Sequence, residues 1–214
     1  MLAVLTAADT GVDMKLIGIT GGVGAGKSQI LSYIEKNTNS RILLADEAAH
    51  IVKEPGQPCY TKLVQLLGEE VLEDDGQINK GKMAARIFAD KEILAQVNAI
   101  IHPAVKTYIL NEIDKERKAA VKEFFFLEAA LLIEEGYHKI VDEMWYIYAA
   151  EPVRRQRLKE NRGYSDEKIT QIMKSQLSEE TFRAHCKEVI DNSNDLLDTY
   201  RQIDEILQRN RELR

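Results

Sequence analysis

A glycine-rich segment between two hydrophobic patterns constrains the fold of this chain more than any other stretch. It reads, in chain order, Gly21-Gly22-Val23-Gly24-Ala25-Gly26-Lys27-Ser28. The apolar run at 15–20 before it is typical of a buried strand, and Ile30, Leu31 and Ile34 after it begin the apolar stripe of a helix. Glycines let consecutive backbone N–H groups turn toward one phosphate group, and the segment fits the pattern G-x-x-x-x-G-K-[ST]. The sequence therefore predicts a strand, a phosphate-binding loop and a helix from about residue 27 to 36.

The residues of this loop have distinct expected roles toward a nucleoside triphosphate. Lys27 is expected to reach the β- and γ-phosphates, and the Ser28 hydroxyl is expected to hold Mg²⁺. The N-terminal end of the following helix adds a favourable potential for an anion. A glycine-rich turn that binds no nucleotide is the competing interpretation. The predicted nucleotide-binding residues of the loop are Gly22, Val23, Gly24, Ala25, Gly26, Lys27 and Ser28.

Composition and charge argue against several classes of protein. The 214 residues are 44% hydrophobic and 30% charged, as in an ordinary globular protein. The net charge of −6 argues against general nucleic-acid binding, which uses a basic surface. No apolar run approaches the ~20 residues of a membrane span, so no membrane association is expected. Cys59 and Cys186 lie far apart and form no C-x-x-C motif, which fits the reducing cytoplasm.

Strand-like and helix-like segments alternate along the rest of the chain. Apolar runs predict strands at 41–45, 123–127, 143–149 and 188–192. Helical spacing between the first two of these runs predicts helices at 59–67, 82–88, 92–101 and 104–116. The alternation predicts an α/β fold, a parallel sheet flanked by helices with a helical insertion. Asp46 follows the run at 41–45, so we expect it at the same edge of the sheet as the phosphate-binding loop.

A phosphate-binding loop leaves three classes of protein open. A GTPase needs a guanine-reading N-K-x-D segment, but the strand at 143–149 leads into Ala-Glu-Pro. A motor or transport ATPase is normally larger and carries an apolar strand that ends in Asp-Glu. A small-molecule kinase needs a carboxylate near the phosphates, arginines for the transferred group and a substrate lobe. Asp46, the arginines at 154–162 and the helical insertion supply all three, so the sequence favours a kinase.

Longer motifs resemble the dephospho-CoA kinase family over residues 15 to about 207. The family's D-A-D segment is similar to Leu44-Ala45-Asp46, with His50 and Pro55-Gly56 at the matching distance. The remaining matches are 17–28 for the opening motif, 85–89 around Arg86, 97–103 ending in His102-Pro103, 128–134 starting at Glu128, Gln176, and 189–192 ending in Asn192. The resemblance implies a P-loop NTPase fold with a helical substrate-domain insertion and a lid.

Three departures from the family's pattern bear on the site. Leu44 replaces the first Asp of D-A-D, which leaves Asp46 as the only carboxylate of that pair. Glu128 and Ala130 replace an Asp and a Pro. The lid motif R-D-G stands as Asn161-Arg162-Gly163, so its arginine is displaced by one position. Which lid arginine touches phosphate therefore stays open among Arg155, Arg157 and Arg162.

The resemblance also implies a reaction: ATP-dependent phosphorylation of the ribose 3′-hydroxyl of dephospho-CoA, the last step of coenzyme A synthesis. Asp46 would accept the hydroxyl proton, and Lys27 with Arg157 or Arg162 would stabilise the transferred group. Ser28 would hold Mg²⁺, with Asp46 or Glu128 in its outer shell. The implied substrate contacts are Asp46, His50, Arg86, His102 and Glu128, and Asn192 would lie near the adenine.

Structural interpretations compete with several of these roles. Asp46 could cap a helix, His102 could be a buried structural histidine, and Arg86 could be a solvated helix charge. Asn192 could cap the last strand instead of approaching the adenine. Two other functions also stay open. One is a nucleoside or nucleotide kinase of the same architecture, and the other is a catalytically silent nucleotide-binding regulator.

The expected organisation is one P-loop kinase domain at 14–214, preceded by a loosely ordered N-terminal extension at 1–13. Core segments are expected at about 14–48, 121–150 and 182–212, the CoA-substrate insertion at about 49–120 and the lid at about 151–181. The expected ligands are dephospho-CoA, ATP and Mg²⁺. We expect a cytoplasmic monomer or weak homo-oligomer that binds neither nucleic acid nor a membrane.

Overall fold

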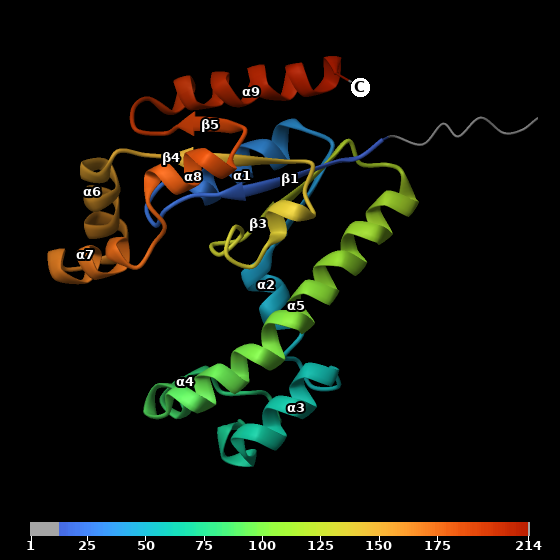
Figure 1. Cartoon of the computed structure of the whole chain (residues 1–214), viewed down its shortest axis with the longest axis vertical. Helices are drawn as coiled ribbons and strands as arrows, with labels where there is room; N and C mark the ends of the chain where they lie inside the picture. Colours follow the sequence, from blue (N-terminus) through green and yellow to red (C-terminus); the bar gives the residue numbers. More distant parts are fainter. Residues whose placement is uncertain (1–12, 214) are drawn as a thin grey trace, which may run out of the picture. The chain divides into compact units, whose positions relative to one another are not determined.

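The computed structural model describes residues 13–213, which contain a parallel β-sheet (Figure 1). Within these residues the five strands take the order β2-β3-β1-β4-β5. β1 pairs in parallel with β3, Lys15 opposite Phe124, and with β4, Ile17 opposite Glu143. The predicted α/β architecture is confirmed. The strands are β1 (Lys15–Thr20), β2 (Ser40–Leu44), β3 (Phe124–Glu128), β4 (Glu143–Tyr148) and β5 (Glu188–Asp191).

The described chain forms two compact units, which we call the core unit (residues 13–42 and 116–213) and the helical unit (Leu43–Lys115). The core unit contains α1 (Lys27–Asn37), α6 (Glu151–Arg162), α7 (Asp166–Lys174), α8 (Glu179–His185) and α9 (Leu196–Glu212). The helical unit contains α2 (Ala45–Ile51), α3 (Pro58–Leu67), α4 (Lys80–Ala89) and most of α5 (Lys91–Ala119). Residues 1–12 of the expected N-terminal extension lie outside the described residues.

Helices cover both faces of the core unit's sheet. Successive side chains of a strand point to opposite faces, and β4 uses both. Tyr146 stacks on Phe182 of α8 with ring centroids 4.8 Å apart, whereas Glu143 bonds to Asn210 of α9. α9 also packs on α1, where Tyr33 and Tyr200 stack at 3.8 Å. This coverage explains why the strands are apolar on both sides, as parallel strands usually are.

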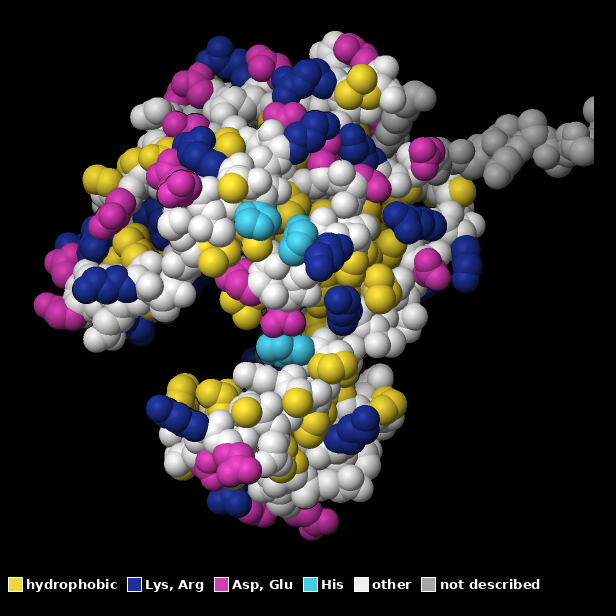
Figure 2. All heavy atoms as spheres, in the orientation of Figure 1, with side chains coloured by type: hydrophobic (Ala, Val, Ile, Leu, Met, Phe, Trp, Pro, Cys, Tyr) yellow, Lys and Arg dark blue, Asp and Glu magenta, His cyan; other side chains and the backbone are white. Residues whose placement is uncertain are grey.

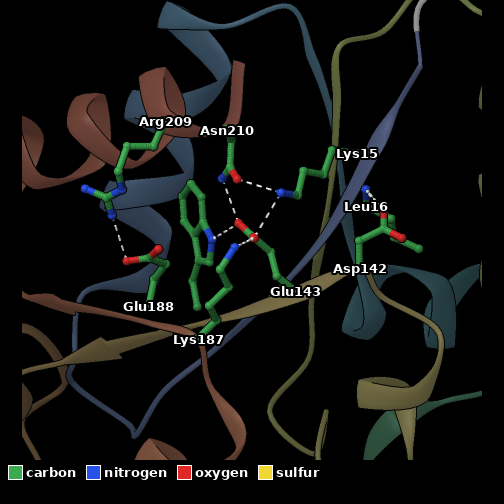
Figure 3. Close-up of polar contacts among 9 residues, drawn as sticks. Lys15, Leu16, Asp142, Glu143, Lys187, Glu188, Arg209 and Asn210 are labelled. Carbon is green, nitrogen blue, oxygen red and sulfur yellow. Dashed lines mark hydrogen bonds and ion pairs between the residues drawn. The ribbon is translucent and has the colours of Figure 1, made fainter. Parts of the chain in front are cut away.

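A buried carboxylate joins strands and helix at one point of the core unit (Figure 3). The Glu143 side chain is 2% exposed, and its Oε2 lies 3.0 Å from Lys15 Nζ and 2.8 Å from Lys187 Nζ. Its Oε1 accepts from Asn210 Nδ2 at 2.7 Å and from Trp145 Nε1 at 2.9 Å. Burial alone would raise the pKa of Glu143, but these four donors outweigh it and lower the pKa to about 2.

The prediction of two separate helices at 92–101 and 104–116 is wrong, because α5 runs unbroken through Pro103. Proline in a helix interior removes one hydrogen bond and costs about 3 kcal/mol. The buried residues Val97, Val105, Ile109 and Ile113 keep helical spacing across the proline. Burying this continuous apolar stripe offsets the cost at Pro103.

One other boundary differs from the prediction. β2 ends at Leu44 and α2 begins at Ala45, so Asp46 lies in the first turn of a helix rather than directly after the strand. Arg162, the arginine of the displaced lid motif, is the last residue of α6. Gly163 ends that helix in the left-handed conformation, with φ of 60°.

α5 also bears on the expectation that no segment could span a membrane. In the described part of the chain, it is the one helix long and apolar enough to cross a membrane by length and composition. That criterion alone neither confirms nor contradicts the expectation. The core helix of a globular protein meets the same criterion, but such a helix is mostly buried, whereas 17% of the apolar window of α5 is buried in the structure.

Candidate active site

The glycine-rich loop joins the end of β1 to the start of α1 in a tight turn. Ala25 N donates to Gly22 O at 3.1 Å, and Gly26 has φ of 92°, a left-handed conformation that favours glycine. A Cβ at Gly22 would collide with the Arg154 guanidinium, and one at Gly26 with the Asn192 amide. Gly26 is therefore favoured both by backbone conformation and by space, whereas at Gly22 a side chain would displace the Arg154 guanidinium.

Arg154 of α6 and Gln176 hold one side of the loop. Arg154 Nε donates to Val23 O at 2.8 Å, and its terminal nitrogen donates to Gln176 Oε1 at 2.8 Å. Gln176 Oε1 also accepts from Val23 N at 3.2 Å. Burial lowers the pKa of Arg154. The backbone N–H and C=O of Val23 thus both form hydrogen bonds with residues that follow β4.

Arg157 and Asn192 hold the other side of the loop. Asn192 is 1% exposed, and its Nδ2 donates to Ala25 O at 2.8 Å. Its Oδ1 accepts from Thr199 Oγ1 at 3.1 Å, and its backbone oxygen accepts from Arg157 at 2.9 Å. Arg157 also donates to Ala25 O at 3.5 Å. Both residues were predicted to contact nucleotide or phosphate, and in the structure both support the loop.

Lys27 and Glu128 face each other beside the loop. Lys27 Nζ donates to Gly21 O at 2.8 Å and lies 3.5 Å from Glu128 Oε1. Glu128 is the last residue of β3, which pairs with β1, so the sheet places its carboxylate near the start of α1. Ser28 is exposed in the first turn of α1. This arrangement leaves a lysine, a hydroxyl and a carboxylate around the N-terminal end of one helix.

Two observations bear on whether this loop fits a bound nucleotide and its metal. The Thr20 hydroxyl, at the end of β1, is buried and has no hydrogen-bond partner. Over residues 13–213, no group of three or more His, Cys, Asp or Glu could hold a metal ion. Mg²⁺ beside a nucleotide is usually bound by phosphate oxygens, water and one or two protein oxygens. The Ser28 hydroxyl and the Glu128 carboxylate fit that mode of binding.

The other two arginines of the predicted lid differ in their partners. Arg155 donates to Glu151 Oε1 at 2.7 Å and to Thr170 Oγ1 at 3.1 Å, so it joins α6 to α7. Arg162 is exposed, and no residue from 13 to 213 forms a hydrogen bond or ion pair with it. Among the three lid arginines, only the guanidinium of Arg162 forms no hydrogen bond or ion pair within residues 13–213.

The remaining predicted residues belong to the helical unit. Asp46 is exposed in the first turn of α2, and His50 is exposed one turn later. Arg86 is exposed on α4, and the described residues offer it no hydrogen bond or ion pair. His102 is half-buried on α5. Of these four, only Asp46 and His50 are on the same helix.

Arg154 and Gln176 both contact the loop, but no individual role was predicted for either: Arg154 was one of the arginines at 154–162, and Gln176 was one of the family matches. One sequence signal could have found Arg154. It lies three residues before Arg157 and four before the buried Leu158, and these spacings put the three side chains on one helical face. Gln176 carries no such local signal, because its contact with Val23 spans 153 residues of sequence.

A glycine-rich loop between β1 and α1 of a parallel sheet, with arginines of α6 packed against it, is typical of a P-loop kinase. The family model described as dephospho-CoA kinase matches residues 15–198. The chain belongs to the dephospho-CoA kinase family.

Individual relatives agree with this assignment. The chain is 33% identical over 187 residues to the dephospho-CoA kinase of Shouchella clausii, covering 87% of this chain and 94% of that one. A crystal structure of Thermus thermophilus TT1252 has a TM-score of 0.75 at 25% identity, covering 92% of this chain and 97% of that one. The dephospho-CoA kinase of Campylobacter jejuni has the same fold, with a TM-score of 0.70 at 20% identity over 90% of this chain and 95% of that one.

Proposed function

We propose that this protein transfers the γ-phosphoryl group of ATP to the ribose 3′-hydroxyl of dephospho-CoA, forming coenzyme A and ADP. The observation that carries the proposal is the family match over residues 15–198, which spans the loop, Asp46 and the lid segment. In the transfer, the hydroxyl oxygen forms a bond to the γ-phosphorus while the bond to the β-phosphate oxygen breaks. The displaced oxygen leaves as part of ADP.

The loop supports binding of the triphosphate. Its backbone N–H groups and the N-terminal end of α1 offer a favourable potential to phosphate oxygens. Lys27 would exchange its bond to Gly21 O for contacts with the β- and γ-phosphates. Ser28 would hold Mg²⁺, with Glu128 in the outer shell of the ion. When bound, Mg²⁺ neutralises part of the negative charge of the phosphates.

Asp46 is the proposed general base. It is the carboxylate that the family resemblance assigns to the acceptor hydroxyl, and it is exposed in the first turn of α2, two residues after β2 ends. Phosphoryl transfer depends mainly on positioning and charge neutralisation, so an ordinary carboxylate can serve as the base. His50, Arg86 and His102 are proposed contacts of dephospho-CoA in the helical unit.

A coupled assay of ADP release tests the proposal against its two alternatives. The proposed reaction is supported if ADP is released only when dephospho-CoA is present and neither adenosine nor AMP can replace it as acceptor. Release with adenosine or AMP alone would instead identify a nucleoside or nucleotide kinase. Binding of ATP without turnover of any acceptor would identify a silent regulator.

Arg162 and Arg157 are expected to affect different kinetic constants. Arg162 has no protein partner in the described chain, so Arg162→Ala should lower kcat about tenfold by removing charge that stabilises the transferred group. Arg157→Ala should mainly raise KM for ATP, because Arg157 supports Ala25 and Asn192. Steady-state kinetics at varied ATP separates the two effects. Lys174→Ala, an exposed lid lysine, is the control, and the reverse pattern would contradict the assignment.

The wider organisation is part of the same proposal. We place the CoA-substrate insertion at about 49–120 and the lid at about 151–181, in a cytoplasmic protein that is a monomer or weak homo-oligomer. Acidic and basic side chains alternate over the visible face, without one broad basic area (Figure 2). That distribution and the net charge of −6 support small-molecule rather than nucleic-acid partners.

A further inference from the structure

Three basic side chains gather in the helical unit. They are His50 of α2, Lys53 just after that helix and Lys80 at the first position of α4; we call them the basic cluster. Lys80 Nζ lies 3.4 Å from His50 Nε2. Burial lowers the pKa of Lys53, and the charge of Lys80 lowers it further. Burial, Lys53 and Lys80 together lower the pKa of His50.

The positive charge of the basic cluster is not balanced by an ion pair. The negative charges of Asp46 and Glu47 raise the pKa of His50, and the charge of Asp46 also raises the pKa of Lys53. These effects are smaller than the lowering by burial and by the neighbouring lysines. Within residues 13–213, no carboxylate lies at ion-pair distance from Lys53 or Lys80. The repulsion between Lys53 and Lys80, which the smaller effect of Asp46 does not cancel, is unfavourable for folding. A bound anion would remove that cost.

The cluster borders an apolar groove. A cavity of about 570 Å³ is lined by Val52 and Cys59. Val52 directly precedes Lys53 in the chain, and the charge of Lys53 lowers the pKa of the Cys59 thiol, which burial raises. Pro103 and Tyr108 of α5 line the same cavity, and Lys62 of α3 adds one charged side chain to its otherwise uncharged lining. A ligand that joins a charged phosphate group to a long, largely uncharged arm therefore matches this surface.

We propose that His50, Lys53 and Lys80 bind the pyrophosphate group of the acceptor nucleotide, with its uncharged arm in the adjacent groove. The inference rests on the proposed function, since dephospho-CoA has both parts. Its pyrophosphate bridge carries two negative charges, which the two ammonium groups can balance. With Nε2 of His50 accepting from Lys80, its Nδ1 carries a proton that can be donated to a phosphate oxygen. ATP also has phosphates but lacks the arm, so the groove favours the acceptor.

Charge-neutralising variants test the site. Lys53→Gln and Lys80→Gln should each raise KM for dephospho-CoA about tenfold, while kcat and KM for ATP change less than about twofold. Lys91→Gln, an exposed lysine at the start of α5, is the matched control. An unchanged KM for dephospho-CoA would overturn the proposal. An equal rise in both KM values would also overturn it, because the cluster would then serve the phosphates of ATP.

Two further measurements separate this proposal from the proposed reaction. Titration of inorganic pyrophosphate into the full chain with saturating ADP should show binding at least tenfold weaker in the Lys53→Gln/Lys80→Gln variant. This comparison remains valid even if dephospho-CoA proves not to be the acceptor, and equal binding would overturn the site. Thermal unfolding should show no loss of stability in the variant, because the lysines repel each other. A clear fall in the unfolding temperature of the variant would contradict the inference that repulsion between Lys53 and Lys80 destabilises the fold.

Discussion

Asp46→Asn is expected to lower kcat about 100-fold or more while leaving the affinity for ATP almost unchanged. General-base catalysis contributes roughly 10²–10⁴ in rate, and an amide cannot accept the hydroxyl proton. Asn keeps the size and the hydrogen-bonding capacity of the side chain, so the acceptor should still bind. Single-turnover kinetics with bound ATP and varied dephospho-CoA measures the chemical step, and equilibrium titration measures ATP affinity.

Glu47→Gln is the matched control for this experiment. Asp46 and Glu47 both lie in the first turn of α2 and both are exposed. Either substitution removes one negative charge from the N-terminal end of a helix, which costs about 0.3–1 kcal/mol of helix stability. Only the Asp46 variant should lose turnover. Comparable kcat values for the two variants would exclude Asp46 as the base and leave it as a residue that stabilises α2.

The parts of the fold that depend on local pattern could be predicted from the sequence. The run at 15–20, the glycine loop and the stripe of Ile30, Leu31 and Ile34 became β1, the loop and the buried face of α1. Ser165 is of a residue type that commonly caps helices, and its side chain accepts from Lys168 N before α7. Such features depend on residues a few positions apart, where spacing alone determines which side chains share a face.

The support of the loop could not be predicted in the same way. Asn192 reaches Ala25 across 167 residues of sequence, and Arg154 reaches Val23 across 131. The sequence marked Asn192 and the arginines at 154–162 as important, but it could not distinguish a contact with ligand from a contact with the loop. That distinction depends on which side chains still have free hydrogen-bonding groups after the chain has folded.

Pro103 shows a second limit of sequence patterns. Proline usually ends a helix, and the prediction followed that rule. The apolar residues of α5 kept their spacing beyond the proline, so tertiary burial determined the outcome. A test of the apolar stripe across Pro103, and not only before it, would have predicted the long helix.

Glu143→Gln is expected to destabilise the protein by about 3 kcal/mol at neutral pH. The folded-state pKa of Glu143 is about 2, against an ordinary value of 4.5, and a tenfold change in a protonation equilibrium corresponds to about 1.4 kcal/mol. The variant would leave Lys15 and Lys187 facing an amide that offers them no negative charge. Urea-induced unfolding should show the loss, whereas Glu205→Gln, an exposed position on α9, should change stability by less than about 0.5 kcal/mol.

The pH dependence gives the sharper form of this prediction. Because the pKa of Glu143 is lower in the folded state than in the unfolded chain, its contribution is fully present above about pH 4.5 and is lost as the pH falls toward about 2. The stability gap between wild type and Glu143→Gln should therefore narrow over this window. A gap that stays constant from pH 6 to pH 3 would mean that the carboxylate acts through shape and hydrogen bonds rather than charge. Lys15 and Lys187 would then contribute little to joining β1, β4 and α9 at this point of the core unit.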